Sequence, residues 1–245
     1  MADLAFVLLG ESVFPEAAAV AASAKRLGIE LTNGKSEEGI LSFEIASGGL
    51  FFVALMNAPH PDAPQMATGP TSVSPDEAAA APAHCMVTAM GLQGDEMTRD
   101  TLMAALTSTV IDNAPAVGAM LAHGVVFHKA KLFADLARLG AEQGELPPEI
   151  AVDITAARES EERMSFLSHG MSRYGREELY VTCPIRGKGA LDFVFTMVRW
   201  LLTDREKMLP TGETVGRAAD EKVTIQRVAN PTGAGAPVIR LDLAS

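Results

Sequence analysis

The side chains that could carry out acid–base, nucleophilic or metal chemistry are dispersed along this chain. Five histidines are present: His60, His84, His123, His128 and His169. None of them forms an HExxH or HxH pattern. His123 and His128 are five positions apart, so a strand would place them on opposite faces and a helix would not align them as metal ligands. The histidine spacing therefore predicts no metal site.

The two cysteines, Cys85 and Cys183, are far apart and outside any CxxC pair, which excludes zinc ribbons and thioredoxin-like redox sites. His84 precedes Cys85, but adjacent strand residues point to opposite faces, so a thiol–imidazole pair would need a histidine from elsewhere. Both cysteines fall in predicted strands, where a buried, unreactive thiol is the usual state. We therefore expect no catalytic residue, no metal and no cofactor.

Adjacent acidic residues could in principle supply an acid–base pair. They occur at Glu37 and Glu38, Glu161 and Glu162, Glu177 and Glu178, and Asp220 and Glu221. Such pairs usually lie on a solvated face, and nothing in their spacing brings two of them into one cleft, as general acid–base catalysis requires. No catalytic pair is predicted from them.

One short segment has the composition of an anion site. Arg186 and Lys188, each followed by a glycine, lie between a predicted strand and a predicted helix. Free amide groups and the positive end of the helix dipole could hold an anion there. The segment lacks the GxxxxGK[ST] spacing of a P-loop, so an ordinary solvated turn is the alternative interpretation.

Composition and charge restrict the class of partner. The chain has 245 residues, 48% of them hydrophobic, and 20 Lys plus Arg against 31 Asp plus Glu give a net charge of -11. This charge argues against nucleic-acid binding and favours a basic partner, although acidity can also serve solubility alone. No apolar run approaches the roughly 20 residues that span a bilayer, and Asp3 stands where a signal peptide would carry Lys or Arg. We expect a cytoplasmic protein without membrane association.

In the first half of the chain, apolar runs predict strands at 4–9, 40–46, 50–56, 84–90 and 116–121. Helices are expected at 14–27, around 102–110, and at 129–139, where Gly140 would end the last one. Six prolines between 57 and 83 predict a long connection, interrupted by a short helix at 75–81 that Ser74 caps.

In the second half, strands are predicted at 150–155 and 179–183, and a hairpin at 222–228 and 238–243. Met164, Leu167 and Met171 recur at helical spacing and predict a helix over 161–171. The helix expected at 190–202 has an unbroken apolar stripe, so it must pack on a sheet.

This order of elements predicts an α+β protein of two packed lobes, each a mixed, mainly antiparallel sheet with helices on one face. The segment 143–148 has the composition of a linker. We therefore expect an N-terminal lobe over 1–142 and a C-terminal lobe over 143–245, with one compact domain as the alternative.

Three segments taken together are similar to a known family. HGMSRYGREEL at 169–179 resembles its pattern T-x-G-[ML]-x-x-[FY]-G-x-x-E-[LI]. TGETVG at 211–216, followed by ADEKV at 219–223, resembles G-[DE]-T-[IV]-G-x-x-x-[DE]-E-K-[IV], and PHP at 59–61 with AHCMVT at 83–88 resembles its P-x-P loop and H-x-x-[VI]-x strand. This is the bacterial family called domain of unknown function 4261. The chain departs from it at Ser168, where threonine is common, and at Met120 and Leu121, where an aromatic pair is.

The resemblance implies no activity and no catalytic residue. Proteins of this kind often occur in bacterial genomes near secreted toxins and secretion loci, which implies an immunity or accessory role. We therefore expect a cytoplasmic binding protein that occludes a bacterial secreted toxin, for example a basic toxin domain. A hydrolase or transferase whose site has no motif, or a structural subunit of a secretion apparatus, are the alternatives. The sequence leaves the oligomeric state open.

If the protein binds a basic partner, exposed acids should form the contact, because complementary charge speeds encounter and rejects wrong partners. The candidates are Glu177, Glu178, Asp220 and Glu221, which lie in the two segments most similar to the family. Their alternative role is structural, because acids at strand starts often accept hydrogen bonds from turns.

Overall fold

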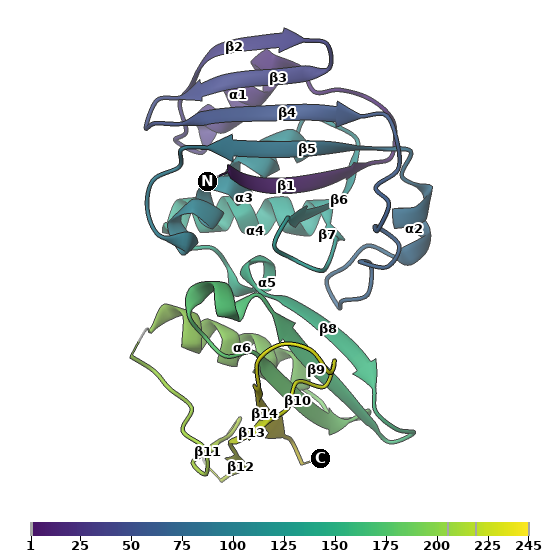
Figure 1. The fold of residues 1–245 in the computed structure, drawn as a ribbon, viewed down its shortest axis with the longest axis vertical. Helices are drawn as coiled ribbons and strands as arrows, with labels where there is room; N and C mark the ends of the chain where they lie inside the picture. Colours follow the sequence, from purple (N-terminus) through teal and green to yellow (C-terminus); the bar gives the residue numbers. More distant parts are fainter. Residues whose placement is uncertain (1, 205, 219, 245) are drawn as a thin grey trace. The chain divides into compact units, whose positions relative to one another are not determined.

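The computed structural model describes residues 2–204, 206–218 and 220–244 (Figure 1). The chain divides into two compact units, residues 1–151 and 152–245, which we call the first and the second unit. The division lies beyond the segment 143–148 because that segment packs on the first unit. Helix α5 (Pro148–Ala151) contacts helix α4 (Ala130–Gln143), and Leu146 is buried.

The expected end of α4 at Gly140 is wrong. The helix continues to Gln143 and ends at Gly144, whose left-handed φ of 73° suits glycine. Gly140 lies inside α4, where a Cβ atom would come within 2.8 Å of the Pro147 ring. Position 140 requires glycine because the following segment, from Glu145 to Pro147, packs directly against its backbone.

The first unit is built on an antiparallel sheet with the strand order β2-β3-β4-β5-β1-β6-β7. Its strands are β1 (Ala2–Leu9), β2 (Leu31–Glu37), β3 (Ile40–Ile45), β4 (Leu50–Met56), β5 (Ala83–Met90), β6 (Ala116–Leu121) and β7 (His128–Lys129). The sequence did not predict β2, because this edge strand is polar, largely exposed and interrupted by a bulge. The hairpin of β3 and β4 is confirmed.

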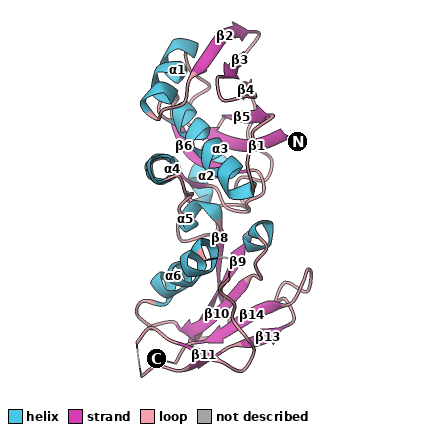
Figure 2. Ribbon diagram, turned by 90° about the vertical axis from the view of Figure 1, so that its left-hand side faces the viewer, coloured by secondary structure: helices cyan, strands magenta, loops and turns pink. Residues whose placement is uncertain are grey.

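Helices α1 (Ala17–Arg26), α3 (Glu96–Ile111) and α4 cover one face of this sheet, and Figure 2 shows α1 and α4 on one side of the strands. Helix α1 starts three residues later than expected, after Glu16. The core between helices and sheet includes Val7, Phe51, Val87 and Leu106, all fully buried. These strand residues alternate with others that point to the opposite face.

The proline-rich segment 57–74 and helix α2 (Pro75–Ala80) cover part of that opposite face. Their apolar side chains pack with Leu8 of β1 in a buried cluster that also contains Ala63, Ala67, Val73, Ala78, Ala81, Met120 and Phe127. Ser74 caps α2 as expected, and Glu77 completes a capping box by accepting from the Ser74 amide.

The second unit has a mixed sheet with the order β13-β14-β10-β9-β8. Its strands are β8 (Asp153–Arg158), β9 (Arg163–His169), β10 (Leu179–Pro184), β13 (Gln226–Val228) and β14 (Val238–Asp242), with β14 parallel to β10. Strands β11 (Thr214–Val215) and β12 (Val223–Thr224) form a separate antiparallel pair that precedes β13 in the sequence. The segment η1 (Met171–Tyr174) is a single 3₁₀ turn between β9 and β10. The α+β class with helices packed on both sheets is thus confirmed.

Helix α6 (Ala190–Thr203) is the helix that the apolar stripe predicted, and it contacts β10. Phe193, Val194, Met197, Val198 and Leu201 are buried along it. None of the helices in the described part of the chain is long and apolar enough to cross a membrane.

The helix expected over 161–171 is wrong. Residues Arg163–His169 form β9, which pairs on one side with β8 and on the other with β10. The apolar spacing fits a helix, but a strand flanked by two neighbours makes backbone hydrogen bonds along both edges, and tertiary pairing overrides the local period. The strand expected at 150–155 likewise begins only at Asp153, after α5.

Candidate functional site

Glu177, one of the acids expected to contact a partner, lies in an ion pair within the second unit. Both Glu177 carboxylate oxygens accept from Arg227, at 2.8 Å from Nε and 2.6 Å from Nη2. The same guanidinium donates to Thr211 Oγ1 at 2.6 Å. Glu177 therefore links the turn before β10 to β13, although it remains half exposed.

Glu178 has a structural role. Its carboxylate accepts hydrogen bonds from Ser168 Oγ at 2.6 Å, from the Gly170 amide at 3.0 Å and from the Ser172 amide at 3.2 Å. Ser168 Oγ in turn accepts from the Leu179 amide at 2.7 Å. These bonds hold the connection between β9 and β10, which contains η1, and they agree with the structural alternative expected for Glu178.

Glu221 is also paired, whereas Asp220 is exposed. The Glu221 carboxylate accepts from the Arg217 guanidinium and from the Arg217 amide, at 2.6 Å for the amide. These hydrogen bonds lower the pKa of Glu221. Arg217 Nη1 also donates to the carbonyl oxygen of Lys188 at 3.1 Å. Of the four candidate acids, Asp220 alone points an exposed carboxylate outward with no hydrogen bond or ion pair among those described.

The candidate anion site has mixed charge. Arg186 is exposed and lines an open cavity of about 570 Å³, together with Arg158, Glu161 and Glu162. The two carboxylates oppose the binding of an anion beside the two guanidinium groups. Lys188 is exposed but does not line this cavity. The anion-binding role expected of Arg186 and Lys188 therefore stays a prediction.

The cysteines are buried thiols. Cys85 is completely inaccessible in β5 and Cys183 is 1% exposed in β10. Burial raises the pKa of Cys85 to about 12. Burial also raises the pKa of Cys183, although the nearby Arg163 and Arg217 oppose the change. Neither thiol is positioned to act as a nucleophile at neutral pH.

We expect both thiols to react slowly with a disulfide reagent in the native protein. Labelling at pH 8 should proceed at least about a hundredfold faster in denaturant, because the thiolate is both disfavoured and inaccessible in the fold. Absorbance of the released thiolate, followed with and without urea, measures both rates. Rapid native labelling of Cys85 would show that β5 opens or that the thiol is activated.

Two histidines belong to an aromatic cluster at the end of the first sheet. The His60 ring lies edge-on to Phe6, His84 and Phe127, with centroid separations of 4.9, 5.1 and 5.1 Å. Burial lowers the pKa of His60, the nearby His84 adds to this effect, and Asp62 opposes it. His60 Nδ1 accepts from the Asp62 amide, which requires the neutral ring. These histidines pack rather than converge on a substrate.

The other first-unit histidines form separate contacts. His128 Nδ1 lies 2.8 Å from Thr71 Oγ1, and His123 Nε2 lies 3.9 Å from Asp100 Oδ2. No group of three or more His, Cys, Asp or Glu side chains in the described residues is arranged to hold a metal ion.

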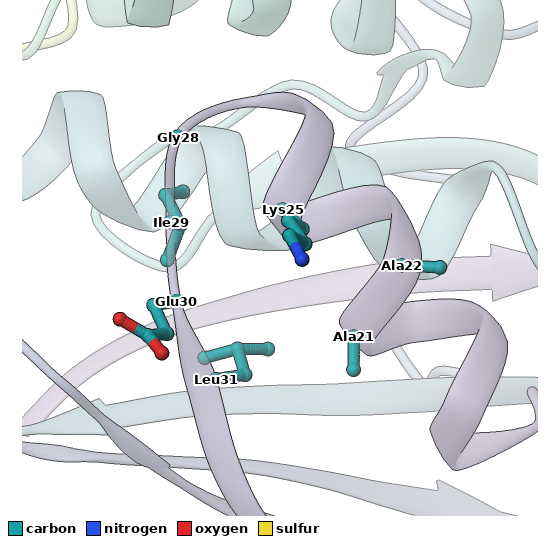
Figure 3. A pocket seen from close by; sticks show the side chains of 7 residues that line it. All are labelled: Ala21, Ala22, Lys25, Gly28, Ile29, Glu30 and Leu31. Carbon is teal, nitrogen blue, oxygen red and sulfur yellow. The ribbon is translucent and has the colours of Figure 1, made fainter.

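A cavity of about 480 Å³ lies between α1 and the start of β2 (Figure 3). Lys25 and Glu30 are its charged residues, and Ala21, Ile29 and Leu31 contribute most of the apolar lining. One cation and one anion among otherwise apolar lining residues supply no evident nucleophile or acid–base pair. The cavity gives no chemical assignment.

The most unusual surface is on the first sheet, opposite the helices. Five large apolar side chains of β3, β4 and β5 are exposed there: Ile40 (46%), Leu50 (41%), Met56 (44%), Met86 (37%) and Met90 (45%). We call these five residues and the strand surface between them the outer face. The three strands are adjacent in the sheet (Figure 1).

Strand register makes the outer face continuous. Leu50 pairs with Met90, Phe52 with Thr88, Ala54 with Met86, and Ile40 with Ala54. Paired residues on one face of a sheet lie side by side, so these side chains form one largely apolar surface that is interrupted by Thr88. Isolated exposed apolar residues are ordinary, whereas neighbouring ones that form a contiguous patch are characteristic of interaction surfaces.

Charged residues border the outer face on the side of β2 and β3. Glu37 pairs with the exposed Ile40, and Glu44 pairs with Leu50. An open groove of about 590 Å³ follows this border and is lined by Lys35, Glu44, Leu50 and others. The surface therefore has large apolar side chains in the middle and polar side chains along one margin, where two acids, Glu37 and Glu44, accompany Lys35.

The two units differ sharply in charge. Residues 1–151 contain 18 acidic and 7 basic residues, whereas residues 152–245 contain 13 of each. The first unit thus carries the whole net charge of -11, and the second unit is neutral. The candidate acids were chosen by motif resemblance, and all four lie in the neutral unit. A count of charge in each unit would instead have indicated the first unit.

Comparison of the chain with protein-family models, with curated proteins and with solved structures found no match. The resemblance to the bacterial family of unknown function therefore stays a prediction. The function is therefore inferred from the geometry and charge of the two units.

Proposed function

We propose that this protein acts by binding a basic protein partner through its first unit. The observation that carries the proposal is the segregation of charge, with an excess of 11 acidic residues in residues 1–151 and none in residues 152–245. A surface potential of one sign on one unit steers an oppositely charged protein to that unit and raises the association rate.

The resemblance supplies the class of partner in this proposal. An immunity protein occludes a toxin and needs a rigid surface of complementary charge, not a catalytic group. A basic domain of a secreted bacterial toxin would meet that description. Glu177, Glu178 and Glu221 are engaged within the second unit, so the first unit is better placed to supply free carboxylates.

The experiment begins with capture of partners from a bacterial lysate by the full-length chain, followed by purification of the captured protein. We expect that protein to be basic and its dissociation constant to rise with salt. The triple variant Glu37→Lys, Glu38→Lys, Glu44→Lys should weaken binding roughly tenfold or more, because it reverses three exposed charges of the first unit.

The matched control reverses three exposed acids of the neutral unit, in the variant Glu206→Lys, Glu213→Lys, Asp220→Lys. Its dissociation constant should stay within about twofold of the wild-type value. Equal weakening by both triple variants would mean that net charge alone acts at long range. An acidic partner, or turnover of a small substrate by the purified chain, would contradict the proposed function.

A further inference from the structure

We propose that the outer face is the docking surface for this partner, and that the partner presents an apolar centre bordered by Lys or Arg. The inference rests on the proposed function and names its surface. In the complex, apolar partner side chains would cover Met56, Met86 and Met90, and basic side chains would pair with Glu37 and Glu44 at the margin.

The outer face has the composition of an interface centre. Its five named side chains expose between 37 and 46% of their surface, and none of them is charged. Three of the five are methionines, whose unbranched, polarizable side chains adapt to different partner surfaces. Depletion of charge at the centre with polar residues at the rim is the usual anatomy of a protein interface.

The same side of the sheet already serves as a packing surface within the chain. Next to the outer face, Phe6 pairs with Met86 and packs against the buried cluster formed by Leu8 and the segment 57–74. Small apolar residues of that segment, such as Ala63 and Ala67, lie on the sheet with almost no exposure. The cover reaches Phe6 and His84, which is buried beneath His60, and the apolar surface continues on β5 and β4 at the exposed Met86, Met90 and Leu50.

The negative charge of the first unit distinguishes among the molecules that could cover the outer face. A second copy of this chain would bring another first unit with a net charge of -11, and repulsion between the two acidic units opposes their association. An anionic bilayer would be repelled in the same way. A basic protein surface is attracted at the margin and can still bury apolar side chains at the centre, so it satisfies both features of the outer face.

The test uses the full chain with carbon-13-labelled methionine methyl groups and a model probe. The probe is an amphipathic peptide of about 18 residues that has leucine on one face and lysine on the other. We expect it to shift the methyl signals of Met56, Met86 and Met90. The buried Met103 and Met171 should serve as unperturbed references. A matched peptide with glutamate in place of lysine should cause no shift.

Two variants test whether the methyl shifts arise from peptide binding at the outer face. Met86→Lys puts a charge at the centre of the outer face and should weaken peptide binding roughly tenfold or more, without lowering the unfolding midpoint, because the side chain is exposed. Met208→Lys changes a methionine of the second unit that is 69% exposed, and it should leave binding unchanged. Met90→Gln provides a second substitution if Met86→Lys destabilises the fold.

Four results would overturn the inference. If the lysine peptide binds with salt dependence but the three methyl signals do not move, the proposed function survives and the outer face is the wrong surface. If no basic probe or partner binds at all, the proposed function fails with it. Shifts of the same methyls on raising the protein concentration alone would assign the face to a second copy, and shifts with phosphatidylglycerol vesicles would assign it to a membrane.

Discussion

Val198→Asp is expected to unfold the second unit. Val198 is fully buried on α6, in the stripe that contacts the second sheet. An aspartate there would either be buried as an unpaired charge or force α6 off the sheet. Such substitutions cost more than about 4 kcal/mol, a large part of the stability of a typical domain.

Fluorescence of Trp200 measures this effect, because Trp200 is the sole tryptophan of the chain and lies on α6. In the variant we expect emission typical of a solvated indole and rapid labelling of Cys183 without denaturant. Thr196→Asp is the matched control, since Thr196 is exposed on the same helix and its replacement should change stability by less than about 0.5 kcal/mol. A native unfolding curve for Val198→Asp would contradict the packing of α6.

The second large effect is expected for Glu178→Ala. The substitution removes one half-buried carboxylate that accepts from Ser168, Gly170 and Ser172, and it leaves two backbone amides without their acceptor. Hydrogen bonds to charged groups contribute more than neutral ones, so we expect a loss of about 2–4 kcal/mol in the free energy of unfolding. Urea unfolding followed at Trp200 reports it.

Glu177→Ala is the natural control, because Glu177 is the adjacent acid and pairs at the surface with Arg227. Exposed ion pairs contribute little, so its unfolding midpoint should lie close to that of the wild type. Neither variant should change binding to the basic partner if the first unit forms the contact. Equal destabilisation by the two substitutions would show that the hydrogen bonds of Glu178 do not hold the turn.

The sequence by itself determined those elements whose local signals agree. The stripe over 190–202 predicted α6, Ser74 and Pro75 predicted the start of α2, and alternation followed by Gly48 and Gly49 predicted the hairpin of β3 and β4. Each of these segments contains its own helix cap, turn residues or apolar periodicity, so its local preference and its tertiary contacts favour the same structure. The burial of both cysteines followed in the same way from their strands.

Tertiary structure alone decided the segments whose local signals are ambiguous. Residues Arg163–His169 have apolar spacing that suits a helix, but neighbouring strands on both sides make them β9. The polar strand β2 forms because its backbone pairs with the free edge of β3. The apolar period of a segment does not show whether neighbouring strands will pair with it.

The candidate surface shows the same division. The apolar run over 50–56 predicted a strand, but without polar alternation it does not show which side chains are covered. Helices α1, α3 and α4 cover one face of the sheet, whereas helix α2 and the segment 57–74 cover only part of the other, where Leu50 and Met56 remain exposed. The sequence determined that the strand is apolar, and the number of layers packed on the sheet decided which of its apolar side chains remain exposed.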